Sequence, residues 1–283
     1  MDRRLTPFNG RVAHERLRGQ VPAERFTEGR LQRVVTPLAD LCAAPGGARD
    51  RQLLMGQGFS VLDEDGDHAF GQALRDGYVG WVARSALGDW LAPGHRVALP
   101  AAHLYPAPDV KAPAGALLSL GAEVTVIEAA GAWARTDAGA CIARAALAPV
   151  GRPETDPVAV AQSLTGTPYL WGGNSREGID CSGLVQAACL ACAIPCPGDS
   201  DLQAAALGRA LAPAEALQRA DAVFWRGHVG LMAGPGMLIH ANAHTMAVVT
   251  EPLAAVVARI ASAGGGQITG RRRFLPGPAP AGT

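Results

Sequence analysis

The chain of 283 residues has no excess of charge of either sign, with 25 basic and 25 acidic side chains. Nucleic-acid-binding domains are usually basic, and attraction to an anionic membrane needs a positive surface, so neither partner is expected. Long apolar runs are also absent. The N-terminal stretch MDRRLTPFNGRVAHERL contains arginines but no apolar run behind them, which argues against a secretory signal, and no later stretch is long enough to span a membrane. These absences predict a cytoplasmic protein.

Cysteine is sparse for a chain of this length, and its six residues form no evident disulfide framework. Reduced thiols in a cytoplasm are the simpler interpretation. Cys189, Cys192 and Cys196 have a spacing that suggests a metal site, but the first two fall on a predicted helix and no fourth ligand is evident. We therefore predict packing within an alanine-rich helix, and no metal or other cofactor.

Length and composition indicate several domains. A chain of 283 residues with 48% hydrophobic residues can form two or three separate cores. Residues 1–30 have little apolar periodicity and are interpreted as an N-terminal arm. Composition shifts at residue 150, where the linker GRPETDP (151–157) precedes a further domain, 150–275. The Pro/Gly-rich residues 276–283 are predicted to be a disordered tail.

Between the arm and the linker, the sequence repeats itself. Residues 31–92 and 93–149 share three similar segments, in which short alternating apolar stretches are separated by Gly and Pro. This pattern predicts two small antiparallel β-barrels or sheets. The aligned segments are RVVTPLADLCAAP (33–45) with RVALPAAHLYPAP (96–108), LLMGQGFSVL (53–62) with LLSLGAEVTVI (117–127), and GWVARSAL (80–87) with ACIARAAL (140–147).

The stretch PYLWGGNSREGIDCSGLVQ (168–186) contains the strongest candidate for chemistry, Cys181. Leu184, Val185 and Ala188 recur at helical spacing, so a helix is predicted to begin near Cys181, with Asp180 as its N-cap. A thiol in the first turn lies at the positive end of the helix dipole, which favours the nucleophilic thiolate. The alternative is a small buried hydrophobic residue, the commonest role of a free cysteine.

A cysteine nucleophile needs a base, and two histidines lie in strand-like runs after Cys181. A three-residue turn at 234–236 would place Ala233 opposite Met237 and Gly230 opposite His240. His228 and His240 would then share one face as diagonal neighbours, about 7–8 Å apart at Cα, whereas a turn of two or four residues would put them on opposite faces. The alternative interpretation is two unrelated core or surface histidines.

Together these motifs resemble the NlpC/p60 superfamily of papain-like cysteine peptidases. The resemblance covers about residues 155–275 and rests on DCSG (180–183), HVGL (228–231), IHAN (239–242), GTPYLWGG and PGDSDLQ. It implies Cys181 as nucleophile, His228 as general base, His240 as the group that orients it, and bacterial cell-wall peptides as substrates. The repeated modules resemble bacterial SH3 domains. The expected fold is therefore α+β, with two SH3-like β-barrel modules before a papain-like domain.

Within this superfamily, the chain most resembles the γ-D-glutamyl-L-diamino-acid peptidases, also called dipeptidyl-peptidase VI. Those enzymes recycle freed murein peptides that carry an unblocked N-terminal L-alanine. The resemblance implies Asp199 as the acid that binds this amine; capping of the next helix is a competing role, and the two roles are compatible. Gln57 stands where the family tends to have a further acid, so one charge is expected to be missing. The substrate-binding residues expected from the resemblance are Tyr78, Tyr169, Trp171, Asp180, Ser182, Asp199 and Ser200.

Three alternatives stay open at this point. A noncatalytic wall-binding protein would have no use for the cysteine and the histidines. A different amide hydrolysis or acyl transfer would use the same nucleophile and base. Tyr78, if exposed, offers a rigid ring and a hydroxyl to a ligand, but a half-buried strand residue is the favoured alternative. The run Arg271–Arg273 is expected to be a solvated edge strand.

Overall fold

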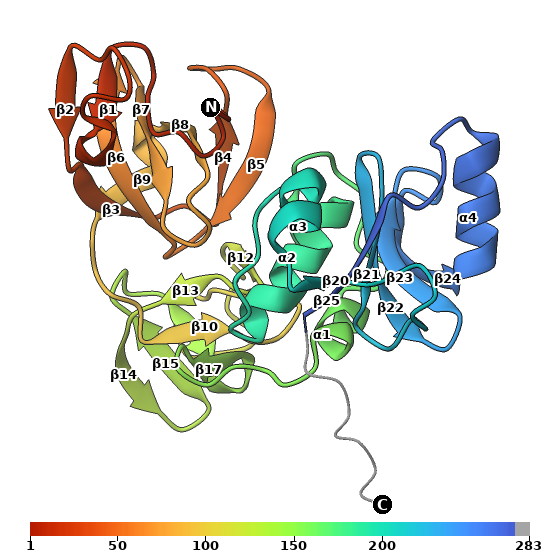
Figure 1. Cartoon of the computed structure of the whole chain (residues 1–283). Coiled ribbons are helices and arrows are strands. Elements are labelled where there is room, and N and C mark those ends of the chain that lie inside the picture. The colour runs from red at the N-terminus through yellow and green to blue at the C-terminus, as the bar shows by residue number, and fades with distance from the viewer. Residues whose placement is uncertain (275–283) are drawn as a thin grey trace, which may run out of the picture. The chain divides into compact units, whose positions relative to one another are not determined.

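The computed structural model describes residues 1–274 (Figure 1), so the tail predicted at 276–283 lies outside the described residues. The chain forms two compact units. The first comprises Met1–Pro153 together with Trp171–Gly178, and the second comprises Glu154–Leu170 and the chain from Ile179 onward. Within residues 1–274, no helix is long and apolar enough to cross a membrane.

The first SH3-like module is an antiparallel sheet with strand order β5-β4-β8-β7-β6-β3-β9. Its interior is filled by large apolar side chains from alternate strand positions, among them Leu41, Leu53 and Phe59, which are fully buried. A 3₁₀ turn, η2 (Arg84–Ala86), separates its last two strands. The strands are β3 (Arg30–Val34), β4 (Leu38–Cys42), β5 (Arg49–Leu54), β6 (Gly58–Asp65), β7 (His68–Ala73), β8 (Val79–Ala83) and β9 (Leu87–Asp89).

The second module has a similar element order with shorter strands and one strand more, and these strands pair as three small sheets. The repeat extends to single turns: the amides of Gly56 and Gly121, both at positive φ, donate to the carbonyls of Val34 and Val97 at 2.8 and 2.9 Å. Its elements are β10 (His95–Val97), β11 (Ala101–His103), β12 (Leu117–Ser119), β13 (Glu123–Val124), β14 (Val126–Ala130), β15 (Trp133–Thr136), β16 (Cys141–Ala143), η3 (Arg144–Ala146) and β17 (Leu147–Pro149).

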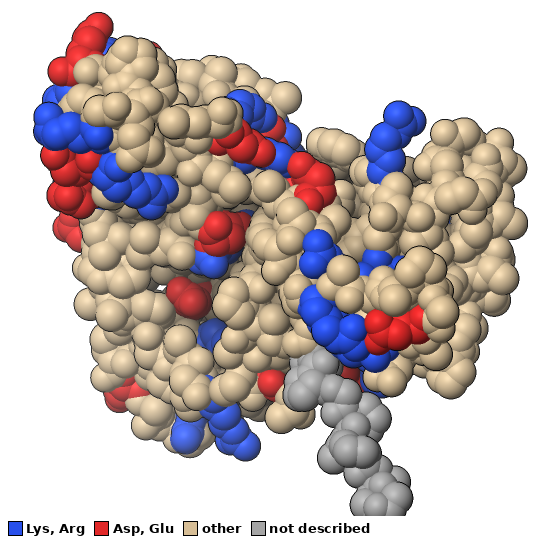
Figure 2. Space-filling view, viewed as in Figure 1, with Lys and Arg blue, Asp and Glu red and all other residues tan. Residues whose placement is uncertain are grey.

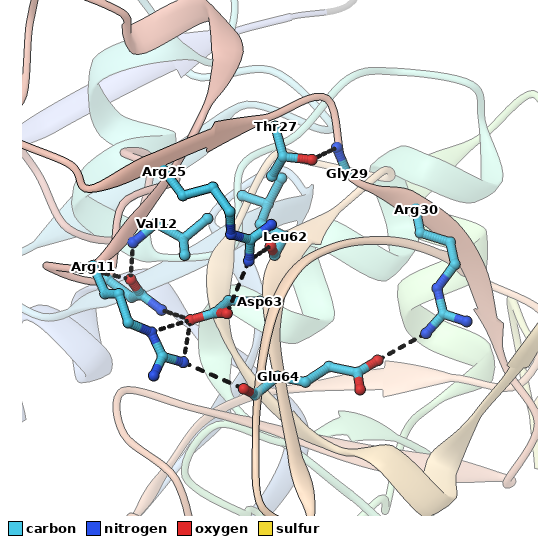
Figure 3. Close-up of polar contacts among 10 residues, drawn as sticks. Arg11, Val12, Arg25, Thr27, Gly29, Arg30, Leu62, Asp63 and Glu64 are labelled. Atoms are coloured by element: carbon cyan, nitrogen blue, oxygen red, sulfur yellow. Dashed lines mark hydrogen bonds and ion pairs between the residues drawn. The ribbon is translucent and has the colours of Figure 1, made fainter.

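A buried carboxylate, that of Asp63 on β6, is one of the groups that bind the N-terminal arm to the first module (Figure 3). Asn9, Arg11 and Arg25 donate to its oxygens at 2.8, 2.6 and 3.0 Å. Burial alone would raise the pKa of Asp63, but the hydrogen bonds from Arg11 and Asn9 outweigh it and hold the pKa below its usual value. The arm itself contains the parallel strands β1 (Val12–His14) and β2 (Arg25–Thr27) and the turn η1 (Glu15–Leu17).

The second unit contains an antiparallel sheet with strand order β20-β25-β21-β22-β23-β24. Helices α1 and α2 pack against β22 and β23, and α4 packs against β24 (Figure 1). The helices are α1 (Pro157–Ser163), α2 (Cys181–Ala191), α3 (Ser200–Ala206) and α4 (Leu253–Ser262). The strands are β20 (Arg209–Ala210), β21 (Ala222–Trp225), β22 (His228–Gly234), β23 (Met237–Asn242), β24 (Ala247–Pro252) and β25 (Gly270–Arg273), and the short strands β18 (Asn174–Ser175) and β19 (Gly178–Ile179) precede α2.

The prediction of a solvated edge at the basic run 271–273 is wrong. Strand β25 lies between β20 and β21, and its arginines bind the connector that precedes β21. Arg273 donates to both carboxylate oxygens of Asp221 at 2.8 and 2.6 Å, and Arg271 donates to the carbonyl of Ala212 at 2.6 Å. The basic run therefore fixes an irregular segment rather than protecting an edge.

Candidate active site

The predicted helix begins at Cys181, which is buried with 6% of its surface exposed. The side chain of Asp180 caps this helix, as predicted, because its Oδ1 accepts from the amide of Gly183 at 2.6 Å and from the hydroxyl of Ser182 at 2.9 Å. The cap fixes the first turn and directs the amides of that turn toward the region around the thiol. This is the environment that favours a thiolate.

The hairpin β22–β23 carries both candidate histidines on one face, as predicted, but by a different route. The pairs Leu231–Ile239 and Met232–Leu238 give the predicted register, yet Gly234, not Ala233, pairs with Met237. The turn therefore has two residues, and a bulge at Ala233 supplies the odd residue that keeps the alternation in phase. The predicted three-residue turn is wrong, whereas the shared face is confirmed by the contact between the two imidazoles.

That contact joins Nε2 of His228 to Nδ1 of His240 at 2.8 Å. The ring of His228 also lies beside Trp225, with 5.7 Å between ring centroids, and His240 is almost fully buried. Burial lowers the pKa of both imidazoles, and the neighbouring His240 and Arg259 make a second positive charge at His228 still less favourable, which lowers its pKa further. Both rings are therefore held neutral near pH 7, which is the state in which a histidine can accept a proton.

Gly230 makes this pairing sterically possible. A Cβ at this position would lie 2.9 Å from the side chain of Leu238 and 3.1 Å from the Cβ of His240. The HVGL motif thus contains a glycine for packing reasons, because any side chain there would push β23 and its histidine away.

Three residues that the sequence did not indicate complete the polar chain behind His240. Its Nε2 lies 2.9 Å from Oε1 of Glu251 and 3.2 Å from Nδ2 of Asn242. Arg259 of α4 donates to both oxygens of Glu251, at 2.7 and 2.8 Å, and mainly for this reason the pKa of Glu251 falls to about 2. The IHAN motif could have indicated Asn242, which follows His240 by two positions on the same strand, whereas Glu251 depends on the register between β23 and β24.

Tyr169 is half-buried and interacts electrostatically with Cys181. Burial first, and then the charges of Cys181 and Asp180, raise the pKa of Tyr169 to about 12. Its hydroxyl is consequently protonated throughout the neutral range and can donate a hydrogen bond. A neutral donor beside a thiol is suited to binding a carbonyl oxygen that becomes negative.

The loop that precedes Cys181 folds with the first unit over residues 171–178. Gln52 and Asn174, both buried, bind each other reciprocally: the amide of Asn174 donates to Oε1 of Gln52 at 3.2 Å, and the amide of Gln52 donates to Oδ1 of Asn174 at 3.4 Å. The carbonyl of Trp171 accepts from Arg49 at 3.2 Å, while its indole is 70% exposed. Trp171 is therefore a surface side chain on a backbone fixed by the first module.

The remaining residues expected at the substrate site have mixed placements. Asp199 occupies the N-cap position of α3 but makes no side-chain capping hydrogen bond, so the capping role expected for it is not observed. Ser200 begins the same helix and is half-buried. Ser182 is buried and its hydroxyl is committed to Asp180. Asp180 is likewise engaged in its cap, so these two residues support the helix.

In the first module, Tyr78 and Gln57 have structural surroundings. Tyr78 is 2% exposed and belongs to the apolar core of the module. This burial agrees with a packing role for the side chain and not with an exposed ring that binds a ligand. Oε1 of Gln57 accepts from the amide of Leu54 at 3.0 Å and from Arg75 at 2.9 Å. Neither side chain is presented as an open ligand-binding group.

Charge and metal-binding potential are modest elsewhere. On the face shown in Figure 2, acidic and basic side chains lie next to one another, and uncharged residues cover most of the surface. Residues 1–274 contain no cluster of three or more His, Cys, Asp or Glu side chains that could hold a metal ion. The neighbouring thiol of Cys196, and then burial, raise the pKa of the Cys189 thiol well above its usual value.

Two stretches of the chain match known protein families. Residues 166–259, which include helix α2 and the hairpin β22–β23, match the NlpC/P60 family. This region is an NlpC/P60 domain. Residues 41–87 match the bacterial dipeptidyl-peptidase SH3 domain, so the first module is of that type. The resemblance to the NlpC/P60 family and to bacterial SH3 domains is therefore confirmed for these two stretches of the chain.

Curated relatives and solved structures agree with this assignment. Dipeptidyl-peptidase 6 of Lysinibacillus sphaericus is 35% identical over 85 residues, which is 30% of this chain and 31% of that protein. A probable endopeptidase of Mycobacterium tuberculosis is 33% identical over 106 residues, 36% of this chain and 27% of that protein. The chain thus spans less than a third of the length of these relatives.

An NlpC/P60 family protein from Bacillus cereus has the same fold, with a TM-score of 0.73 at 22% identity over 87% of this chain and 100% of that one. A structure of an NlpC/P60 endopeptidase from Photobacterium damselae subsp. piscicida covers 90% of this chain and 74% of that one, with a TM-score of 0.56 at 15% identity. At these identities the likeness concerns the fold, which is α+β with an SH3-like region before the NlpC/P60 domain.

Proposed function

We propose that the protein is a cysteine peptidase that cuts murein peptides between γ-D-glutamate and a diamino acid. The observation that carries this proposal is the hydrogen bond between His228 and His240 on strands that pack against the helix beginning at Cys181. A pair of neutral imidazoles beside a thiol at a helix N-terminus has the composition of a nucleophile, a base and an orienting group.

In this mechanism, His228 takes the thiol proton and the sulfur of Cys181 attacks the scissile carbonyl. The developing oxyanion is stabilised by the backbone amide of Cys181 and by the protonated hydroxyl of Tyr169. Collapse of the tetrahedral species breaks the amide bond, and His228 returns the proton to the leaving amine of the diamino acid. Water, deprotonated by the same imidazole, then hydrolyses the thioester and restores the thiol.

The specificity proposed here is for a free N-terminal L-alanine, and Asp199 is the residue assigned to its ammonium group. Asp199 is a half-buried carboxylate at the N-cap position of α3, where it makes no side-chain capping hydrogen bond. Recognition of an ammonium group requires such an acceptor. Tyr78 is assigned no role in binding the ammonium group, because its ring is buried in its own module.

The names of the relatives support this choice of reaction. One curated relative is a dipeptidyl-peptidase, and the matching SH3 domain is described as that of bacterial dipeptidyl-peptidases. A role in cytoplasmic recycling of freed wall peptides follows from the preference for a free amine. A second candidate, a general wall endopeptidase, is favoured by the mycobacterial relatives, which are named probable endopeptidases.

The two candidates are separated by comparing L-Ala-γ-D-Glu-diaminopimelate with its N-acetylated form. Acetylation should remove most of the turnover, and Asp199→Asn should abolish the discrimination by lowering activity on the free peptide. The matched control is Asp201→Asn, an exposed carboxylate two residues later on the same helix, which should behave as the wild type. Similar rates on both peptides would favour the general endopeptidase.

A further inference from the structure

We propose that Glu251 is a positioning residue that fixes the tautomers of both histidines, so that the nitrogen of His228 available to Cys181 is unprotonated. This inference rests on the proposed function, since it concerns the same catalytic group. It begins from the contacts of one nitrogen atom, Nε2 of His240, which has two neighbours that demand opposite protonation states.

The first neighbour is Oε1 of Glu251, at 2.9 Å. Arg259 donates to both oxygens of this carboxylate, and its pKa of about 2 keeps it ionised at neutral pH. An ionised carboxylate can only accept a hydrogen bond. The contact therefore requires a proton on Nε2 of His240.

The second neighbour is Nδ2 of Asn242, at 3.2 Å. The amide and the hydroxyl of Thr245 both donate to Oδ1 of Asn242, at 2.8 and 3.2 Å, so the NH₂ group must be the end that faces His240. An NH₂ group donates only, and it would require Nε2 without a proton. Two polar residues thus compete for the state of this one atom.

Glu251 determines the protonation state of Nε2, because it is the closer of the two neighbours and carries a full charge. If Nε2 carried no proton, two acceptors would face each other at 2.9 Å, one of them fully charged. The bond to an ionised acceptor is also about twice as strong as a bond between neutral groups. The proton is therefore placed on Nε2, and the neutral ring of His240 keeps a bare Nδ1.

The tautomer of His240 determines the tautomer of His228, the proposed catalytic base. A bare Nδ1 on His240 accepts from Nε2 of His228 across the 2.8 Å contact, so the proton of the neutral His228 ring resides on Nε2. Nδ1 of His228 is left as the basic nitrogen. His228 becomes an imidazolium during the reaction. Its hydrogen bond to His240, and that of His240 to Glu251, then lead to a carboxylate whose negative charge stabilises the new positive charge.

Loss of Glu251 should reverse the tautomers of both histidines. In Glu251→Ala, Asn242 is the remaining polar neighbour of Nε2, so the proton of His240 moves to Nδ1 and donates toward His228. The proton of His228 then moves to its own Nδ1, where it blocks proton transfer from the thiol. Wrong tautomers of this kind can reduce catalysis by as much as 10⁴-fold, so the loss should be on the order of 10²-fold or more. Removing Asn242 as well should restore part of the activity.

Two measurements without substrate test this inference independently of the peptide specificity. Imidazole ¹⁵N shifts of the full chain near pH 7.5 should show Nε2–H and bare Nδ1 on both histidines of the wild type, and the reverse in Glu251→Ala. The rate of Cys181 alkylation should fall at least tenfold in Glu251→Ala and recover in part in Glu251→Ala/Asn242→Ala. A purely structural role predicts further loss in the double variant.

Two further variants keep the test decisive. Glu251→Gln retains an acceptor oxygen and should keep the wild-type tautomers even if Glu251→Ala does not fold. Glu215→Ala removes another arginine-bound carboxylate of the same unit and should leave both histidines unchanged. The inference is overturned if the wild type shows Nδ1–H on His240, if Glu251→Ala leaves tautomers and alkylation unchanged, or if Glu251→Gln reverses the tautomers.

Discussion

Nε2 of His228 lies 2.8 Å from Nδ1 of His240, although the two residues belong to different strands and are twelve positions apart. A two-residue turn alone would place them on opposite faces of the sheet, and the bulge at Ala233 restores the common face. The active-site pairing thus depends on a backbone irregularity and on the absence of a side chain at Gly230.

Substitution of Gly230 should therefore separate the two histidines. Gly230→Ala places a methyl group 3.1 Å from the Cβ of His240, which should cost about 1–3 kcal/mol of stability and about 10²-fold in turnover. Urea unfolding and steady-state kinetics measure the two effects. Gly234→Ala is the matched control on the same strand, because its Cβ would meet no atom within 4 Å. Equal losses in both variants would contradict this account.

Cys181 should be alkylated by iodoacetamide near neutral pH faster than the half-buried Cys192. The helix terminus and His228 favour the thiolate of Cys181, whereas accessibility alone predicts the opposite order because Cys192 is the more exposed thiol. Peptide mapping after short exposure gives the two rates. His228→Ala should slow the labelling of Cys181 only; faster labelling of Cys192 in the wild type would exclude Cys181 as an activated nucleophile.

Gln52→Ala should loosen the loop that precedes the nucleophile. The change leaves the buried amide of Asn174 without the Oε1 acceptor, which should cost about 1–3 kcal/mol. Hydrogen exchange over residues 171–178 should become faster, and turnover should fall because this loop leads directly to Cys181. Gln72→Ala, which removes a single bond to the carbonyl of Gly77, serves as the control. Unchanged exchange in the loop would argue that the first module does not hold it.

Glu123 should make the stability of the first unit depend on pH. Burial, opposed in part by the charge of Arg75, raises the pKa of Glu123 to about 7 from 4.5. A carboxyl group with a raised pKa contributes its stability below pH 4.5 and loses it as the pH rises through 7, where the buried group must ionise. Glu123→Gln should therefore raise the unfolding free energy by about 1–3 kcal/mol at pH 8 but much less at pH 5.

Chemical denaturation at the two pH values measures this difference. Glu128→Gln, which changes an exposed carboxylate on the neighbouring strand β14, is the matched control. A stabilisation of the Glu123 variant that is equal at pH 5 and pH 8 would show that the carboxyl group does not titrate as described.

The sequence predicted those features that depend on local periodicity. Helical spacing after Cys181 placed this residue at a helix N-terminus. Alternation along two strands placed His228 and His240 on one face, but through a three-residue turn, whereas the structure has a two-residue turn and a bulge at Ala233. The similarity of residues 31–92 to 93–149 predicted two modules of short strands. In the structure both stretches consist of short strands, and the turns at Gly56 and Gly121 make equivalent backbone hydrogen bonds.

Features that depend on long-range register were not predictable. Glu251 reaches His240 only because β24 pairs with β23 so that Leu238 lies opposite Glu251, and its ionisation depends on Arg259 from a helix that follows. Local sequence also left the side-chain direction of Asp199 open, since an acid at an N-cap position is usually a cap. The burial of Tyr78 depends on tertiary packing, because a tyrosine beside a glycine suits a core or a surface equally.

The most direct test of the central claim is the release of diaminopimelate from L-Ala-γ-D-Glu-diaminopimelate by three forms of the protein. The wild type and Cys192→Ala should release it together with the dipeptide L-Ala-γ-D-Glu at equal rates. Cys181→Ala should release neither product, because no other residue supplies the sulfur that attacks the carbonyl. Products from the Cys181→Ala variant, or no products from the wild type, would contradict the proposed peptidase.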